Sequence, residues 1–189
     1  MNPEKAHVAP MELGREKRCR TINVTFRRSR CRDRQSTVMS RGRNLVALPE
    51  ITVRNLQRSV QVDVAALQEF AQQALQLCFR IPRNEPTQLK RLRAIFVLLI
   101  SNRRMARLHR QFLGKVGPTD VLTFEHGEIF VSAEMARDQA RSFGSSLGQE
   151  LRLYVVHGLL HLHGFDDREQ VEARRMARME RQILAAALK

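Results

Sequence analysis

Residues 151–167 read LRLYVVHGLLHLHGFDD and combine a dense apolar pattern with three of the six histidines of the chain. Apolar side chains from Leu151 to Leu162 fall on most sides of a helix, which predicts that this helix is buried in the core. Gly164 predicts the end of the helix, because glycine adopts the left-handed conformation at little cost. We therefore expect a core helix over residues 149–163, followed by a turn that leads the chain back.

Two of these histidines have the spacing of a metal site. His157 and His161 lie one helical turn apart, so their rings project from the same face and can bind one ion. His163 lies roughly 120° or more around the helix from both and is expected to point elsewhere. A chain that turns back after the helix brings Asp166 or Asp167 near the imidazoles, and a carboxylate is a competent third zinc ligand. Three ligands leave a fourth position for water, as in catalytic rather than structural sites.

The same spacing also occurs in histidines that only decorate a half-buried helix. In a helix as apolar as this one, two buried imidazoles without partners would be costly, which favours metal binding. The residue after His157 is Gly158, whereas zinc proteases with the HExxH motif have their catalytic glutamate at that position. Glycine cannot accept a proton, so the candidates for the general base are Asp166, Glu134 or a metal-bound hydroxide. We expect His157, His161 and Asp166 to form the catalytic group.

The remaining pattern predicts an α+β domain over residues 50–189, with about four strands, about five helices and the metal site on a helix near the C-terminus. Asp63 is expected to cap the first helix, and Gly127 to form a hairpin turn. The continuous apolar run at 94–100 predicts a strand covered on both faces. The strands are expected at 51–53, 94–100, 121–124 and 128–132, and the helices at 64–78, 102–112, 133–142, 149–163 and 168–187.

The chain has a large excess of positive charge. Lys and Arg number 33 against 19 Asp and Glu, which gives a net charge of +14, and arginine predominates. Such a surface attracts polyanions, and the planar guanidinium group pairs with phosphate through two hydrogen bonds, which favours nucleic acid over lipid. No apolar run approaches the roughly 18 to 20 residues of a membrane-spanning helix. The three cysteines are widely spaced and form no CxxC motif, which is typical of a reducing compartment.

Residues 1–49 differ in composition from the rest of the chain. They contain 12 Lys or Arg and 4 acidic residues, and so carry +8 of the net charge, without a sustained apolar period. This composition predicts a disordered basic arm. There are two alternatives: an organellar transit peptide and a mis-assigned start codon. The early residues Glu4 and Glu12 count against a transit peptide. Charged residues also interrupt any apolar core of a secretory signal, so we expect a protein that is not exported. These residues are Glu4, Lys5, Glu12 and Glu16.

HGLLHLHGFDD at residues 157–167 resembles the HGxLHLxGYDH signature of the YbeY family of bacterial endoribonucleases and rRNA maturation factors. PTDVLTF at 118–124 and GEI at 127–129 are similar to that family's PTDVLSF and GDI segments, and the likeness covers about residues 51–189. The resemblance implies an α+β fold with a mixed four-stranded sheet and one zinc ion per chain. It also implies a cytoplasmic endoribonuclease that acts on single-stranded RNA at the 3′ end of the 16S rRNA of the small ribosomal subunit, with no role for DNA or a membrane.

By position, the resemblance places the metal ligands at His157, His161 and Asp167. Asp167 departs from the family, whose third ligand is usually histidine, and a carboxylate makes the preference for zinc over other divalent ions less strict. Leu113 is a second departure, because members commonly have an arginine there. Three functions stay open: a metal-dependent endoribonuclease, which we favour, a ribosome-associated binding factor with a structural metal, and a metalloprotease, which the basic charge and Gly158 make the weakest.

The basic arm is expected to add affinity for RNA by binding phosphates without sequence preference. We therefore expect deletion of residues 1–48 to weaken RNA binding and to flatten its salt dependence. For each phosphate of a single strand that the arm neutralises, the deletion should reduce the slope of log affinity against log salt concentration by about 0.7. Titrations of the full and shortened chains at several salt concentrations measure both quantities. An unchanged slope would contradict phosphate binding by the arm.

Overall fold

The structure of the protein is a computed structural model that describes residues 48–83 and 85–187. The basic arm predicted at residues 1–49 therefore lies outside the described residues, except for its last two, and stays a prediction. Among the residues that are described, no helix has both the length and the apolar character needed to cross a lipid bilayer.

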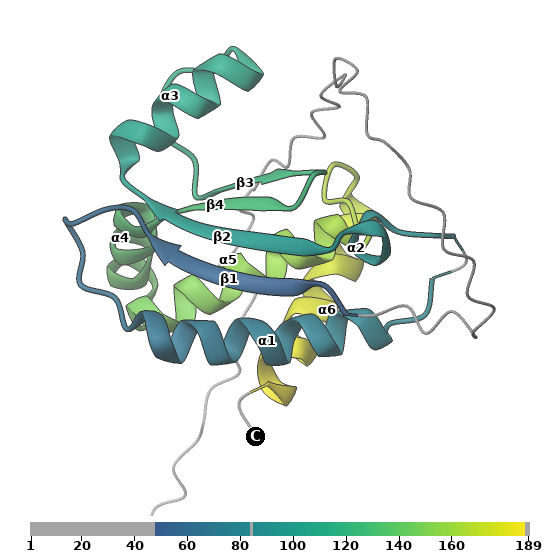
Figure 1. Cartoon of the computed structure of the whole chain (residues 1–189). Coiled ribbons are helices and arrows are strands. Elements are labelled where there is room, and N and C mark those ends of the chain that lie inside the picture. The colour runs from purple at the N-terminus through teal and green to yellow at the C-terminus, as the bar shows by residue number, and fades with distance from the viewer. Residues whose placement is uncertain (1–47, 84, 188–189) are drawn as a thin grey trace, which may run out of the picture.

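A four-stranded mixed sheet forms the middle of the domain (Figure 1). β1 (Glu50–Asn55), β2 (Ala94–Ile100) and β4 (Glu128–Ser132) are parallel, and β3 (Val121–Phe124) pairs antiparallel with β4 at the edge. The strand order is β1-β2-β4-β3. Gly127 forms the turn between β3 and β4 with a left-handed φ of 102°. The predicted α+β class and mixed four-stranded sheet are thus confirmed.

The described residues form six helices, one more than predicted. The additional helix, α2, has only four residues, which is too short for a helical period to be visible in the sequence. Asp63 caps α1 as expected, because its side chain accepts a hydrogen bond from the backbone N–H of Ala66 at 2.9 Å. The helices are α1 (Val64–Arg80), α2 (Gln88–Arg91), α3 (Asn102–Leu113), α4 (Ala133–Phe143), α5 (Leu147–Leu162) and α6 (Gln170–Ala186).

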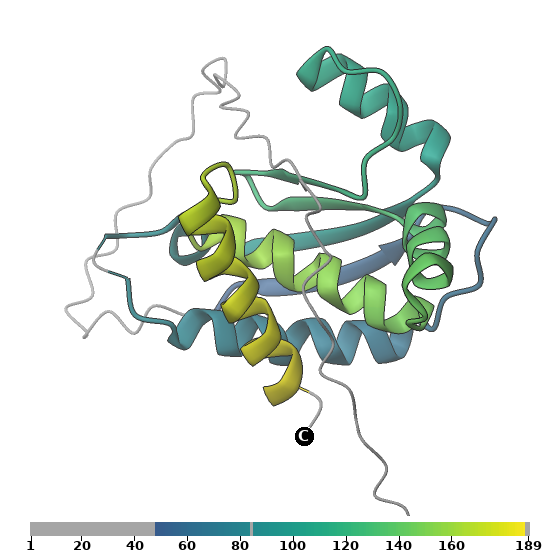
Figure 2. The ribbon, with the colours of Figure 1, turned by 180° about the vertical axis from the view of Figure 1, so that it is seen from behind.

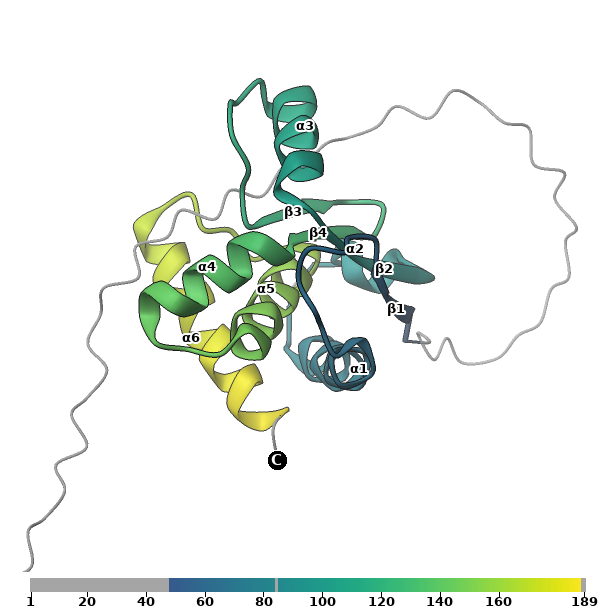
Figure 3. The ribbon, with the colours of Figure 1, turned by 90° about the vertical axis from the view of Figure 1, so that its left-hand side faces the viewer.

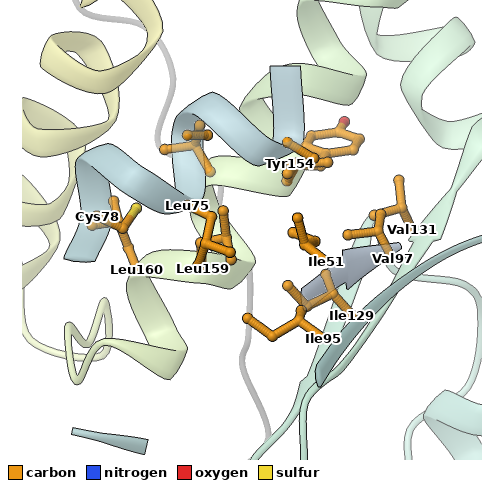
Figure 4. Close-up of a cluster of buried hydrophobic side chains, with 14 of the residues drawn as sticks. Ile51, Leu75, Cys78, Ile95, Val97, Ile129, Val131, Tyr154, Leu159 and Leu160 are labelled. Atoms are coloured by element: carbon orange, nitrogen blue, oxygen red, sulfur yellow. The ribbon is translucent and has the colours of Figure 1, made fainter. Parts of the chain in front are cut away.

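The helices cover the two faces of the sheet unequally. α1, α4, α5 and α6 lie on one face, whereas α3 lies on the other (Figure 1, Figure 3). Seen from behind, α5 runs along the sheet, and α6 lies on the same side and runs obliquely to α5 (Figure 2). In β2, Ile95 and Val97 point towards α5 and are fully buried (Figure 4). Phe96 and Leu98, on the opposite face, are only half-buried. The prediction that this strand is covered on both faces is therefore right only in part, because α3 covers a limited area.

Gly158 allows α5 to approach the sheet closely. A Cβ atom at this position would lie 2.6 Å from Cγ2 of Ile129 and 3.1 Å from Oγ1 of Thr123. Position 158 therefore points at the sheet, and a larger side chain would push the helix away from it. The sequence suggested only that Gly158 cannot act as a base, whereas the structure shows that its role is in packing.

We predict that Gly158→Ala destabilises the fold by about 1 to 3 kcal/mol, because the added methyl group overpacks the contact with Ile129. Gly148→Ala on the same helix is the matched control, since a Cβ there would meet only Oγ of Ser146, at 3.9 Å. The control should be neutral or stabilise by up to about 1 kcal/mol, because alanine favours the helix. Urea unfolding of both variants measures the difference. Equal stabilities would contradict the close approach of α5.

Candidate metal centre

Three side chains from the end of α5 and the following turn converge on one point. The Nε2 atoms of His157 and His161 lie 2.8 Å apart. The carboxylate of Asp167 lies 3.9 Å from each of them, through Oδ2 and Oδ1 respectively. The three side chains are only 9, 3 and 12% exposed, so little water reaches them. One ligand atom from each lies within 4.8 Å of the others, and the group could hold a metal ion.

The other ring nitrogens determine which atoms face this point. Nδ1 of His157 donates to Oε1 of Glu180 at 2.7 Å, and Nδ1 of His161 donates to the carbonyl oxygen of Phe165 at 2.9 Å. A neutral imidazole that donates through Nδ1 presents a lone pair at Nε2. Both Nε2 atoms are therefore acceptors that face a carboxylate. Oriented in this way, the two imidazoles match histidine ligands of a metal ion.

A cation is needed among these three acceptors. Burial lowers the pKa of His157, but Glu180, Asp167 and Asp120 together outweigh burial and hold this pKa above its ordinary value. Burial and the neighbouring charge of His157 lower the pKa of His161 to about 3. The two Nε2 atoms and the carboxylate of Asp167 therefore favour a positive charge between them. A divalent ion would supply that charge, so the residues present fit a metal ion.

His163 does not belong to this group, as helical geometry predicts. Its ring is fully buried, with Nδ1 3.3 Å from the hydroxyl of Thr87 and Nε2 3.0 Å from the carbonyl oxygen of Ile81. The chain turns after it at Gly164, whose left-handed φ of 85° agrees with the predicted helix end. The turn brings the aspartates back towards α5.

The structure separates Asp166 from Asp167. The carboxylate of Asp166 accepts hydrogen bonds from the backbone N–H groups of Asp167 and Arg168 and from the guanidinium group of Arg168, which lowers its pKa. Glu134, the other candidate base, accepts a hydrogen bond from the backbone N–H of Asn102. Neither carboxylate belongs to the group that could hold a metal. A catalytic role of Asp166 stays a prediction.

Glu180 is the functional residue that sequence reasoning missed. It comes from α6, 23 residues after its partner His157. In the sequence it is one of several charged residues on an amphipathic helix, and no motif distinguishes it. Only the packing of α6 against α5 brings it to the imidazole.

A cleft of about 500 Å³ opens beside His161. Oγ1 of Thr123, at the edge of the sheet, is buried in its wall and has no hydrogen-bond partner among the described residues. Charged side chains of both signs line the cleft. The cleft is lined by Pro82, Arg83, Glu85, Pro86, Thr87, Gln88, Thr123, Glu125, His161, Leu162, Gly164 and Arg175.

The chain is similar in sequence to a family of known proteins. A family model described as Endoribonuclease YbeY matches residues 52–187. A relative of that description from Carboxydothermus hydrogenoformans is 35% identical over 148 residues, which cover 74% of this chain and 96% of the relative. Another, from an Anaeromyxobacter species, is 38% identical over 102 residues, which cover 49% of this chain and 53% of the relative. The chain thus spans only about half the length of some relatives that it matches.

A solved structure supports the fold alone. The solution structure of a Thermotoga maritima protein superposes with a TM-score of 0.53 at 24% sequence identity. The superposition covers 72% of this chain and 88% of that chain.

We predict that the purified protein carries one divalent metal ion per chain and that His161→Ala loses it, because one of three ligands is removed. Glu180→Ala keeps all three ligands but loses the acceptor that orients His157. It should lower metal affinity about ten- to hundredfold. Elemental analysis gives the stoichiometry, and titration against a chelating indicator gives the affinity.

His126→Ala is the control for these variants, because the His126 side chain is 50% exposed, pairs with Glu128 and lies outside the metal group. It should keep the metal at wild-type affinity. A wild-type protein without a bound divalent ion after purification in metal-containing buffer would refute the site.

Proposed function

This chain belongs to the Endoribonuclease YbeY family, and from that premise we propose that it is a metal-dependent endoribonuclease that cleaves single-stranded RNA. We further propose that its substrate is the 3′ end of the small-subunit rRNA and that it acts in the bacterial cytoplasm. The observation that carries the proposal is the convergence of His157, His161 and Asp167 on one point, beside a cleft that His161 lines. The relatives' descriptions supply the reaction class, and the site supplies the chemistry.

We propose zinc as the resident ion, one per chain. Two imidazole nitrogens and one carboxylate are a common ligand set of catalytic zinc sites. A carboxylate in place of a third imidazole makes the set harder, so manganese or a similar divalent ion is the alternative. When bound, the ion supplies a Lewis acid for a phosphate oxygen and for the attacking water.

The chain's own residues then have separable tasks in the hydrolysis. Water adds across one P–O bond of the strand, so that one product ends in a phosphate and the other in a hydroxyl group. His157, His161 and Asp167 would hold the ion, and Glu180 orients the ring of His157. The low exposure of this group limits the access of other water. The cleft receives the strand beside His161.

The surface charge supports an RNA substrate rather than a peptide. The helix α3 has four exposed arginines, and no Asp or Glu occurs between residues 101 and 119. Such a surface attracts phosphates. Position 158 cannot hold the glutamate of a zinc protease, because even a Cβ atom would collide with Ile129 there. The exposed arginines of α3 are Arg103, Arg104, Arg107 and Arg110.

We predict metal-dependent cleavage of single-stranded fragments of small-subunit rRNA and no cleavage of DNA of the same sequence. His157→Ala should reduce cleavage to background, because it removes a metal ligand, whereas His126→Ala should cleave like the wild type. Gel analysis of end-labelled RNA, with added zinc or manganese and with a chelator, measures the rate. Tight RNA binding with cleavage no faster than that of His157→Ala would favour a binding factor with a structural metal.

A further inference from the structure

Two arginines flank the ring of Phe165, next to the metal group. The Cζ atom of Arg83 lies 4.5 Å from the ring centroid, and that of Arg175 lies 5.6 Å from it. The ring itself is 4% exposed and therefore fixed by its surroundings. Arg83 comes from the segment between α1 and α2, and Arg175 from α6. Chain segments that are distant in sequence thus bring two guanidinium groups to the turn that precedes Asp167.

A second interaction fixes the guanidinium group of Arg83. Its Nη2 donates a hydrogen bond to the carbonyl oxygen of Gly164. A Cβ atom at Gly164 would lie 3.2 Å from this Nη2, so the absence of a side chain leaves room for the group. An arginine held on both a ring and a carbonyl loses little further entropy when it binds a ligand.

No carboxylate of the described residues forms an ion pair with the guanidinium group of Arg83. Its acceptor at Gly164 is uncharged. Arg175 has only a long contact of 3.8 Å to Glu172, in which both side chains are largely exposed. A guanidinium group has five N–H donors, so Arg83 retains donors for an anion.

Both arginines line the cleft that contains His161. Thr123, 2% exposed, adds a hydroxyl group to the same wall, and Oγ1 has no hydrogen-bond partner within residues 48–83 and 85–187. Buried hydroxyl groups without a partner are costly. Glu85 and Glu125 line the cleft as well, so an anion is favoured at the arginines rather than throughout the cleft.

We propose that Arg83 binds a backbone phosphate of the RNA strand in this cleft, with Arg175 as a weaker second contact. The proposal rests on the proposed function and adds the residue that positions the strand beside the metal group. A planar fork of donors matches two phosphate oxygens, and such charge-assisted pairs are about twice as strong as neutral hydrogen bonds.

The test measures binding separately from cleavage. A fluorescent single-stranded RNA with 2′-O-methyl groups is titrated with the full chain, and anisotropy gives the affinity at several salt concentrations. Arg83→Gln should weaken binding about tenfold and reduce the slope of log affinity against log salt concentration by about 0.7, the value for one phosphate contact on a single strand. Arg83→Lys should keep the slope but recover only part of the affinity, because it keeps the charge and loses the fork. In cleavage assays the loss should appear in KM more than in kcat.

Arg91→Gln is the matched control, because Arg91 is an exposed arginine of α2 outside the cleft. It should bind RNA like the wild type. A structural role of Arg83 alone would lower the melting temperature and leave the affinity and salt slope of the folded variant unchanged, which would overturn the proposal. If Arg83→Gln does not fold, Arg175→Gln replaces it. A loss of about threefold then supports the phosphate site, and wild-type affinity refutes it.

The outcomes also separate this proposal from the proposed function. Weaker binding by Arg83→Gln in a protein that never cleaves RNA keeps the phosphate site and rejects the nuclease. Cleavage by the wild type and by Arg83→Gln with the same KM keeps the nuclease and rejects the phosphate site.

Discussion

The close approach of α5 to the sheet at Gly158 is the contact on which the metal centre depends. Because position 158 faces Ile129, the rotation of the helix is fixed. His157 and His161 then lie roughly 100° and 60° to one side of it, at about 100° per residue. Both rings therefore leave the apolar interface and face α6 and the turn. A helix that is buried along most of its length can in this way present two polar rings without exposing its core.

The groups behind the imidazoles are as important as their spacing. Glu180 and the carbonyl oxygen of Phe165 both accept from Nδ1, which turns both Nε2 atoms into acceptors. Two lone pairs and the carboxylate of Asp167 cannot face one another without a cation between them. The preference for a positive charge is thus built by the packing of α6 and by the turn at Gly164. The histidine pair alone would not impose it.

Local patterns could be read from the sequence, whereas contacts between distant segments could not. His157 and His161 follow from helical spacing, and the turn that returns Asp167 follows from the glycine at its start. Glu180 and Arg83 reach the site only through tertiary packing, and no spacing in the sequence marks them. Leu113 illustrates the same limit: the sequence shows that it is not arginine, and the structure shows that it packs with the apolar cluster beneath α3.

The aspartate at position 167 changes the charge balance of the centre. Two carboxylates, Asp167 on the inner side and Glu180 behind His157, offset the two positive charges of a divalent ion. If the third ligand were an imidazole, the net charge of the metal centre would be more positive by one, and the centre would attract a phosphate by itself. In this chain the attraction must come from elsewhere, and Leu113 is apolar. Arg83, fixed on Phe165 and without a carboxylate partner among the described residues, supplies a positive charge at the cleft that His161 also lines.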